Sequence, residues 1–384
     1  MNTTEQQEIL YRMALTRVMR MGATSQWTLL REVGSATAIF EDRRQLSRSF
    51  QQHAPVTAKA LAQMEDELPR CEQEMQYAEQ HHISILTADD SRYPVRLLSC
   101  PDAPLVLYHL GHTNLNAKHI VSIVGTRHAT TRGNELCQSL IADLARRLPD
   151  TLIVSGLAYG IDVDAHRACL EHQVPTLGVV AHGLDQIYPR EHRHIAVEMM
   201  QQGGVLSEFM SGTKIDKMFF VQRNRIVAGM ADATVVVESP AKGGSLITTE
   251  LANDYNREVF AYPGRTTDKN SEGCLGLIRQ NKAHLITCAD DLLADMGWTE
   301  EAHDPNTQSE AQQLTLFPDL SEEEYKVVTH LQRVEDDSTL AQLATATGMA
   351  VPSLLAVLFS LEMKGLVKTL AGSKYHLLYK KKTP

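Results

Sequence analysis

The sequence predicts an α/β protein with a Rossmann-like, doubly wound and mainly parallel sheet, flanked by a small N-terminal all-α domain and a C-terminal winged helix. Three observations predict it. A helical apolar pattern comes first, short β-branched runs then alternate with helical stretches, and three helical patterns with a hairpin follow an acidic segment. The expected boundaries are 1–80 for the helical domain, 81–298 for the sheet domain, 299–319 for a linker and 320–384 for the winged helix.

Composition limits the classes of function. The formal net charge of -10 excludes a globally basic protein, so any nucleic-acid binding must rest on a local patch. The six cysteines form no CxxC pair and no zinc-like spacing with histidine, which predicts reduced thiols and no metal site. Neither a signal peptide nor an apolar run of membrane-spanning length is evident, so a cytoplasmic protein without membrane contact is expected.

The first 80 residues carry a helical pattern, with apolar residues three and four positions apart at Leu10, Met13, Ala14 and Val18. Gly22 and Gly34 stand where one helix would end and the next begin. The pattern resembles a helix-hairpin-helix or SAM-like module. Such modules contact the DNA backbone or other proteins, and both alternatives stay open here.

Six β-branched runs in the middle of the chain read as buried parallel strands, because they are apolar on both faces and each is followed by a small residue and a helical stretch. The runs end at Gly125, Gly156, Ala181, Glu208, Glu238 and Tyr262. Ligands of such sheets bind beyond the carboxyl ends of the strands. Candidate binding residues are therefore expected in the loops that follow these six positions.

After the first run, Gly125 permits a tight turn, and the amides from Thr126 onward are expected to face an anion above the next helix. Arg127 adds a cation there, unless it is only a solvated loop residue. The GxGxxG fingerprint and its acidic partner are absent, which disfavours NAD and predicts no cofactor.

After the second run, the loop SGLAYGID concentrates Ser155, Gly156 and Gly160 at a strand end, where phosphate can be cradled. Asp162 and His166 lie four residues apart on one helical face. They could form an acid/base pair, but a structural role that fixes the helix to its loop is favoured.

A third loop of this kind contains Gly243, Gly244 and Ser245, and a separate segment, KMFFVQRNR, places cations beside aromatic rings from Lys217 to Arg225. Alone, that segment could be two phenylalanines leading into a buried helix. Beside three loops at one sheet edge, it predicts a wide anion-binding rim. Cations attract a phosphate backbone and an aromatic face stacks on any base, so the expected ligand is single-stranded nucleic acid.

Beyond the acidic linker, helical patterns cover 322–331, 340–347 and 352–364, and two strands flank Gly372. This arrangement is a winged helix. The helix-turn-helix inside it serves DNA contact in some proteins and protein contact in others, and both alternatives remain open.

Taken together, the motifs GTR, SGLAYGID, HGLDQIYPREH, RNRIVAG, GGSLITTELA and REVFAYPG resemble the DNA-processing protein A family, also called DprA or Smf, over residues 83–293. The resemblance implies a protein of natural transformation (competence) and DNA recombination that binds and protects incoming single-stranded DNA. It also implies a homodimer formed through the Rossmann-like domain, help in loading RecA recombinase, and no enzymatic activity.

By position, the resemblance makes Arg127 and Lys217 the phosphate contacts and Phe220 the aromatic that stacks on a base. Residues 223–225 form the RNR motif, whose members divide between DNA contact and fixing the loop. The full predicted DNA-binding set is Gly125, Thr126, Arg127, Ser155, Gly156, Tyr159, Gly160, Lys217, Phe220, Arg223, Asn224, Arg225, Gly243, Gly244 and Ser245. The chain departs from many family members, which have arginine at Tyr159, serine-glycine at Ala181 and His182, and proline at Val221.

A further motif lies in the linker, where QLTLF resembles the short peptide by which bacterial replication proteins bind the sliding clamp. Its pocket-filling residues would be Gln313, Leu314, Leu316 and Phe317. The alternative is that the peptide docks on the winged helix.

The competing enzyme hypothesis is a nucleoside-monophosphate phosphoribohydrolase of the lysine-decarboxylase-like group, whose motif is PGGxGTxxE after a helix beginning RK. Arg223, residues 231–233, Gly243, Gly244 and Glu250 fall in comparable places. However, Leu246 and Ile247 replace a glycine and a threonine of that motif, and Asn224 replaces its lysine, so the contacts to substrate would be lost.

Overall fold

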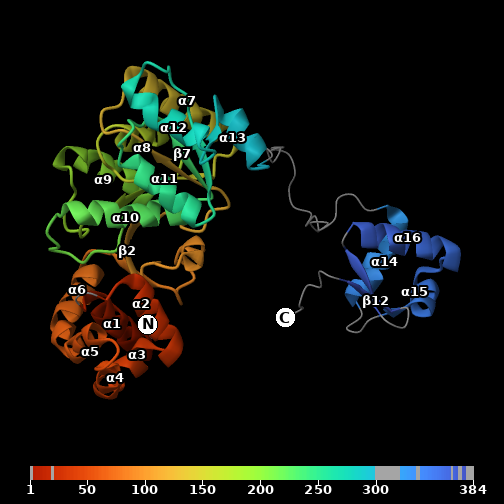
Figure 1. The fold of residues 1–384 in the computed structure, drawn as a ribbon, viewed down its shortest axis with the longest axis horizontal. Coiled ribbons are helices and arrows are strands. Elements are labelled where there is room, and N and C mark those ends of the chain that lie inside the picture. The colour runs from red at the N-terminus through yellow and green to blue at the C-terminus, as the bar shows by residue number, and fades with distance from the viewer. Residues whose placement is uncertain are drawn as a thin grey trace. The chain divides into compact units, whose positions relative to one another are not determined.

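The computed structural model describes residues 3–18, 21–298, 321–333, 338–364, 366–370 and 374–377. The chain divides into two compact units, residues 1–302 and residues 303–384 (Figure 1). The first unit contains a helical module and a large sheet domain, and the second contains a winged helix.

The helical module packs six helices around a core that includes Met13, Leu15, Ile39 and Leu61. Gly22 precedes the second helix and Gly34, with a φ of 101°, ends it, so both predicted helix boundaries are confirmed. The elements are α1 (Thr3–Arg17), α2 (Ala23–Val33), α3 (Ala36–Glu41), α4 (Arg43–Phe50), α5 (Pro55–Ala62), the 3-10 helix η1 (Met64–Glu67) and α6 (Leu68–Gln80).

The sheet domain holds a nine-stranded sheet in the order β1-β2-β6-β5-β4-β3-β7-β8-β9. All six predicted strands are present and parallel, which confirms the doubly wound fold. They are β3 (Ile120–Val124), β4 (Leu152–Ser155), β5 (Thr176–Val180), β6 (Gly204–Ser207), β7 (Ala233–Val236) and β8 (Glu258–Ala261). Sequence analysis missed the antiparallel pair β1 (Ser84–Thr87) and β2 (Val106–Gly111), and the two-residue strand β9 (His284–Leu285).

Helices cover both faces of this sheet because side chains alternate along each strand. In β3, Val121 and Ile123 share a core with α7 and α8, whereas Ile120 and Val124 share a core with α10 and α11. One face carries α7 (Thr131–Arg147), α8 (Ile161–Glu171), α9 (Arg193–Gln202) and α13 (Ala289–Asp295). The other carries η2 (Val95–Ser99), α10 (Lys217–Met230), α11 (Ser245–Asp254) and α12 (Glu272–Arg279), with η3 (Arg190–His192) and η4 (Lys269–Ser271) in loops. In Figure 1, α10 and α11 lie side by side across the sheet.

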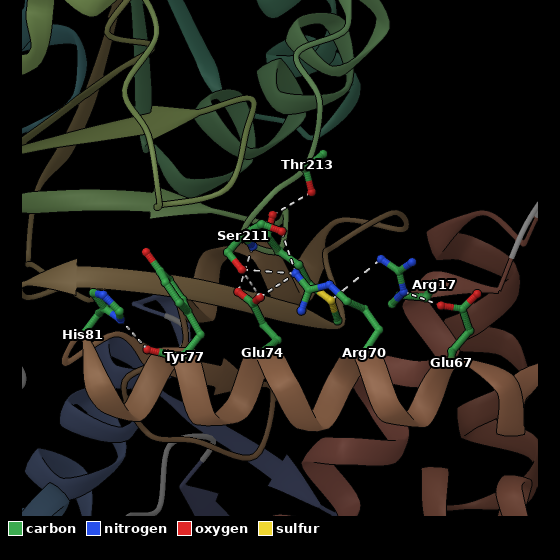
Figure 2. Close-up of polar contacts among 9 residues, drawn as sticks. Arg17, Glu67, Arg70, Glu74, Tyr77, His81, Ser211 and Thr213 are labelled. Carbon is green, nitrogen blue, oxygen red and sulfur yellow. Dashed lines mark hydrogen bonds and ion pairs between the residues drawn. The ribbon is translucent and has the colours of Figure 1, made fainter.

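The helical module is fixed to the sheet domain by a polar cluster between α6 and the loop that joins β6 to α10 (Figure 2). The carboxylate of Glu74 is buried and accepts the Ser211 amide (2.9 Å), the Ser211 hydroxyl (2.5 Å) and an Arg70 guanidinium N–H (2.8 Å). The same Arg70 nitrogen donates to the Ser211 carbonyl at 2.6 Å. The helical module and the sheet domain also share apolar contacts. Leu105 and Tyr108, from the β2 region of the sheet domain, pack in the core of the helical module.

The second unit is a winged helix, as predicted. It contains α14 (Glu322–Arg333), β10 (Ser338–Thr339), α15 (Leu340–Thr347), α16 (Val351–Met363), β11 (Val367–Leu370) and β12 (Lys374–Leu377), with the sheet order β10-β12-β11. Glu324 joins α14 to α16 by accepting bonds from Lys364 (2.8 Å) and Ser360 (2.6 Å). Burial would raise the pKa of Glu324, but these bonds and the Ser321 amide lower it to about 2.

Within the described parts of the chain, no helix combines the length and the apolar character that crossing a membrane requires. The six cysteines are free thiols, of which only Cys288 is partly exposed. Burial raises the pKa of Cys71 to about 12, so this thiol stays protonated at neutral pH.

Candidate nucleic-acid interface

Loops from neighbouring strands meet at the carboxyl edge of the sheet. The strands β4, β3 and β7 are adjacent and parallel, so the loops that follow them lie side by side, as predicted. Gly160, with a φ of 76°, brings the β4–α8 loop against the backbone of Thr126 and Arg127, where a Cβ atom would overlap both residues. The close approach fixes the loop that carries Arg127 in place.

The open surface at this edge is basic and aromatic. The exposed Arg127 guanidinium lies 5.9 Å from the ring centroid of Phe220, and Tyr188 packs edge-on against Phe220 at 5.8 Å between ring centroids. Lys217 begins the same helix as Phe220, is exposed, and makes no hydrogen bond or ion pair with the described residues. Three predicted contact residues, from two segments about 90 positions apart, therefore share one surface.

Phe219 has a different environment from its neighbour. Its ring packs on Phe209 at 4.6 Å between centroids, and Asp216 caps the helix by accepting the Met218 amide at 2.8 Å. Phe219 thus belongs to the packing that holds the start of α10, and Phe220 is left at the surface edge.

Tyr159 also lies at this edge and is 44% exposed. Its hydroxyl donates to Glu191 at 3.1 Å, and its ring lies edge-on to His192 with 4.9 Å between centroids. The bond to Glu191 raises the pKa of Tyr159. A flat ring on the surface is consistent with the predicted stacking role.

Arg223 stands in the predicted DNA-binding set but is inside the protein, so of the two roles left open for the RNR motif its position favours fixing the loop over DNA contact. The residue is 4% exposed and donates to the carbonyl of Val179. Burial lowers the pKa of Arg223, and the charge of Asp162 acts in the opposite direction. Burial likewise raises the pKa of Asp162, although Arg223 and the amides of the β4–α8 loop favour its carboxylate. The Arg223 guanidinium and the Asp162 carboxylate stabilise the buried side of that loop, which agrees with the structural role predicted for Asp162.

Arg225 is buried as well, so it also departs from the predicted DNA-binding set. Its guanidinium pairs with Glu208 and donates to the Asp102 carbonyl at 2.6 Å. Asn224, between the two arginines, is half-buried. The RNR motif is therefore mainly a structural element that fixes α10 to the sheet.

Two further predicted residues, Ser155 and Gly156, are closed to solvent. The Ser155 hydroxyl donates to the Ile123 carbonyl at 2.6 Å. A Cβ at Gly156 would collide with the side chains of Arg223 and Asp162. Both residues shape the loop from inside.

The anion position above the first helix is already filled by the protein. Glu238, 6% exposed, accepts the Thr130 amide (2.9 Å) and the Thr130 hydroxyl (2.5 Å) at the start of α7. The Thr126 amide donates to the Glu238 backbone carbonyl at 2.8 Å. Neither amide therefore faces an external anion as predicted: the Thr126 amide is bonded to a backbone carbonyl, and at Thr130 an internal carboxylate takes the place of a phosphate.

The third loop is compact. Ser245 is buried and donates to Ser239 at 2.8 Å, and a Cβ at Gly243 would collide with the same Ser239 hydroxyl. Gly244 is exposed, with open space where a side chain would stand. Of the three predicted residues in this loop, only Gly244 is exposed, next to the exposed Ala241 and Lys242.

The residues of the enzyme hypothesis do not form a common pocket. Glu250 lies on the exposed side of α11, 4.0 Å from Lys282, whereas the Arg223 guanidinium is enclosed against Val179. Nor does the part of the chain that the structure describes gather three His, Cys, Asp or Glu side chains in a metal-binding group.

Comparison with known proteins identifies the family. Residues 84–297 match the family model described as DNA recombination-mediator protein A, and residues 309–373 match the DprA winged helix domain. The chain belongs to the DNA recombination-mediator protein A family. Its relatives in this DprA/Smf family include Protein Smf of Synechocystis, 34% identical over 332 residues, which covers 78% of this chain and 82% of that protein.

Another relative is the DNA processing protein DprA of Mycobacterium tuberculosis, 32% identical over 372 residues and aligned over 93% of this chain and 92% of its own length. Among solved structures, DprA from Streptococcus pneumoniae superposes with a TM-score of 0.58 at 29% identity, covering 68% of this chain and 96% of that one. DprA from Helicobacter pylori, studied for its single-stranded DNA binding mode, gives 0.50 at 28% identity, covering 56% of this chain and 95% of that one. The predicted DprA/Smf resemblance is thus confirmed.

Sequence reasoning assigned no role to two residues of this DprA/Smf interface. Tyr188, which is 43% exposed, completes the aromatic surface, and Glu238 fills the helix N-terminus. An aromatic residue in a strand-end loop was the available signal for Tyr188. Glu238 gave none, because its contact with Thr130 joins positions 108 residues apart.

Proposed function

We propose that this protein binds single-stranded DNA at the carboxyl edge of its sheet, with Arg127 and Lys217 on phosphates and Phe220 against a base. Tyr159 and Tyr188 extend the stacking surface, and the Gly244 backbone lies at its rim. The observation that carries the proposal is the Arg127 guanidinium beside the Phe220 ring on an open surface. That pairing of cation and aromatic face suits a ligand with both a phosphate backbone and unpaired bases.

The buried and half-buried members of the predicted set act indirectly in this proposal. Arg223 and Arg225 hold α10, Ser155 and Gly156 shape the β4–α8 loop, and the remaining loop positions Gly125, Thr126, Gly160, Gly243 and Ser245 set backbone geometry. Asn224 is left as a candidate contact at the half-buried face of α10.

At the level of the cell, we propose a cytoplasmic recombination mediator of natural transformation that protects incoming DNA, helps load RecA recombinase, and forms a homodimer through the Rossmann-like domain. The family description as a recombination mediator supports this role. In this proposal the protein binds DNA and has no catalytic activity. The clamp-binding motif at Gln313, Leu314, Leu316 and Phe317 lies outside the described residues and stays a prediction.

The test is fluorescence-anisotropy binding to single-stranded oligonucleotides over a range of salt concentrations. Arg127→Ala and Lys217→Ala are each expected to weaken binding and to reduce the magnitude of the log–log salt slope by about 0.7. Phe220→Ala is expected to cost about 1–3 kcal/mol of binding free energy with an unchanged salt slope, because stacking releases no counterions.

Arg279→Ala is the matched control, since Arg279 is an exposed cation in the last turn of α12. If all three site variants bind like Arg279→Ala, the proposed site is wrong. Release of free base from nucleoside monophosphates, abolished by Glu250→Ala, would instead support the phosphoribohydrolase.

A further inference from the structure

A pocket of ≈ 600 Å³ opens at the same sheet edge, between the start of α7 and the loop that follows β8. Three of its lining residues are cations from two separate segments, Arg132 on α7 and Arg265 and Lys269 beyond β8. None of these residues belongs to the predicted DNA-binding set. Its size is in the range of ligand sites, which runs from about 300 to 1,000 Å³.

The three cations have no structural task in this fold. Arg132, Arg265 and Lys269 are exposed, and none makes a hydrogen bond or ion pair through its side chain within the described ranges. By contrast, Arg146, at the other end of α7, pairs with Asp143. Unpaired cations that converge on one concave surface provide a positive potential for an anionic ligand.

The carboxylates of the pocket do not cancel this potential. Glu238 is buried and accepts the amide and hydroxyl of Thr130, and among the described residues it forms no ion pair with the three cations. Asp268 is the other acidic residue of the lining. With both carboxylates counted, the three cations still leave the lining with an excess of one positive charge.

The pocket is linked to the proposed DNA site by a hydrogen bond between two loops. Asn270, in its wall, donates to the His128 carbonyl at 3.0 Å, which ties the β8–α12 loop to the residue next to Arg127. Along the sheet edge, Tyr188 follows β5, Arg127 follows β3 and Arg265 follows β8, in an order β5-β4-β3-β7-β8. A strand that crosses Tyr188 and Arg127 therefore leads toward the pocket.

The chemistry of the lining favours a polymer backbone over a free nucleotide. The pocket has no aromatic residue to stack on a base, and its helix N-terminus is closed by Glu238. A free nucleotide needs both a base contact and a phosphate cradle, whereas a bound strand is anchored elsewhere and offers only phosphates here.

We propose that this pocket is a second subsite for single-stranded DNA, in which Arg132, Arg265 and Lys269 hold phosphates of the nucleotides that lie on the β8 side of the one at Arg127. The inference rests on the proposed function and adds the path of the bound strand, which would run along the sheet edge toward β8.

The experiment compares the triple variant Arg132→Ala, Arg265→Ala, Lys269→Ala with the wild-type protein in salt-dependent binding to a single-stranded oligonucleotide. The expected result is a loss of about tenfold in affinity at low salt and a log–log slope reduced in magnitude by up to about 2, from three phosphate contacts. The double variant Arg132→Lys, Arg265→Lys should keep most of the slope, since it keeps the charge.

The matched control removes three cations from the opposite edge of the sheet domain: Arg146→Ala, Arg279→Ala, Lys282→Ala. Both triple variants should keep the wild-type thermal midpoint, because all the substituted residues are at the surface. An equal loss in both triple variants would show a non-specific charge effect and overturn the subsite.

The outcomes also separate this inference from the proposed function. Wild-type binding by the pocket variant, with weakened binding by Arg127→Ala, would remove the subsite and leave the main site standing. Wild-type binding by both would remove the main site as well. Strong competition by a free mononucleotide, lost in the pocket variant, would make the pocket a nucleotide site and refute the proposal.

Discussion

At the scale of single residues, this interface is decided by which charges the protein has already paired. Arg127 and Lys217 are open to a ligand, whereas Arg223 and Arg225, a few residues further on, are enclosed by carbonyls and carboxylates. A buried guanidinium costs much free energy unless it is paired and hydrogen-bonded, so these partners are part of the fold. Residue type alone therefore does not distinguish a ligand contact from a support.

The Glu238 carboxylate gives a prediction for Gly133. A Cβ at this helical position would lie 2.5 Å from Glu238 Oε2, so Gly133→Ala must displace the carboxylate from Thr130. We expect a loss of about 1–3 kcal/mol in unfolding free energy, measured by chemical denaturation.

Gly276→Ala is the control for Gly133, since Gly276 lies inside α12 with open space around its Cβ position. Alanine there should stabilise the protein by about 0.5–1 kcal/mol. Similar effects of the two substitutions would contradict the role of Glu238.

A pH dependence follows from His166, which is fully buried and bonded to Thr176 at 2.7 Å. Burial, with the charges of His192 and Arg223, lowers its pKa from 6.5 to about 3. The unfolded chain therefore binds a proton that the folded protein does not, and stability is lost as pH falls from about 6.5 toward 3. His109, with a pKa lowered to about 4 by burial, adds an effect of the same sign.

The measurement is the unfolding free energy of the wild type and of His166→Gln at pH 8 and pH 5. The value at pH 8 reports the packing lost in the variant, and the difference between the two pH values reports protonation. The variant should show a smaller difference; an equal or larger one would rule out His166 as a source of acid sensitivity.

At the scale of elements, the position of α16 in the winged helix and the side chains on its surface point to different kinds of partner. α16 stands where a winged helix places its recognition helix, yet Glu362 is the only charged residue in its sequence. Its exposed side chains include Val351 (45%), Leu355 (44%) and Phe359 (66%), spaced four residues apart. A helix that enters a DNA groove needs cations near phosphates, so this surface favours protein contact among the two alternatives left open by the sequence.

Adding carboxylates to α16 tests that interpretation. The double variant Ser353→Glu, Ala356→Glu places two negative charges on its exposed face. We expect the affinity for duplex and single-stranded DNA to stay within about twofold of the wild type, because these carboxylates repel phosphates only if DNA lies close to α16. Band-shift titration of the full chain measures the affinity. A drop of tenfold or more would show that α16 lies against DNA.

At the scale of the whole first unit, the helical module supports the proposed DNA site without supplying any of the residues assigned to it. Glu74 on α6 holds Ser211, which lies in the loop that leads into Lys217 and Phe220 (Figure 2). The position of the helical module is thereby coupled to the start of α10.

Substitution of Glu74 tests this coupling. Glu74→Ala leaves the Ser211 amide and the Arg70 guanidinium without their carboxylate, and we expect a loss of about 2–3 kcal/mol in unfolding free energy with weaker DNA binding. Glu72→Ala, at an exposed position of the same helix, is the control. Thermal unfolding and anisotropy titration measure the two effects, and identical behaviour of both variants would contradict the coupling.

Much of the fold was predictable because its signals are local. Gly22 and Gly34 mark helix ends, six apolar runs mark the parallel strands, and three helical patterns mark the winged helix. The strands β1 and β2 escaped because their pairing is antiparallel and brings together segments about 20 residues apart, without a βα pattern between them.

The fold class, the family motifs and the convergence of three loops on one sheet edge could be predicted from the sequence, since each follows from local pattern or from the parallel arrangement of strands. Which side chains face outward depends on the tertiary structure. It brought Arg127 to Phe220, enclosed Arg223 and Arg225, and placed Glu238 at the start of α7. Burial and charge pairing depend on contacts between residues far apart in the chain, and no local pattern encodes them.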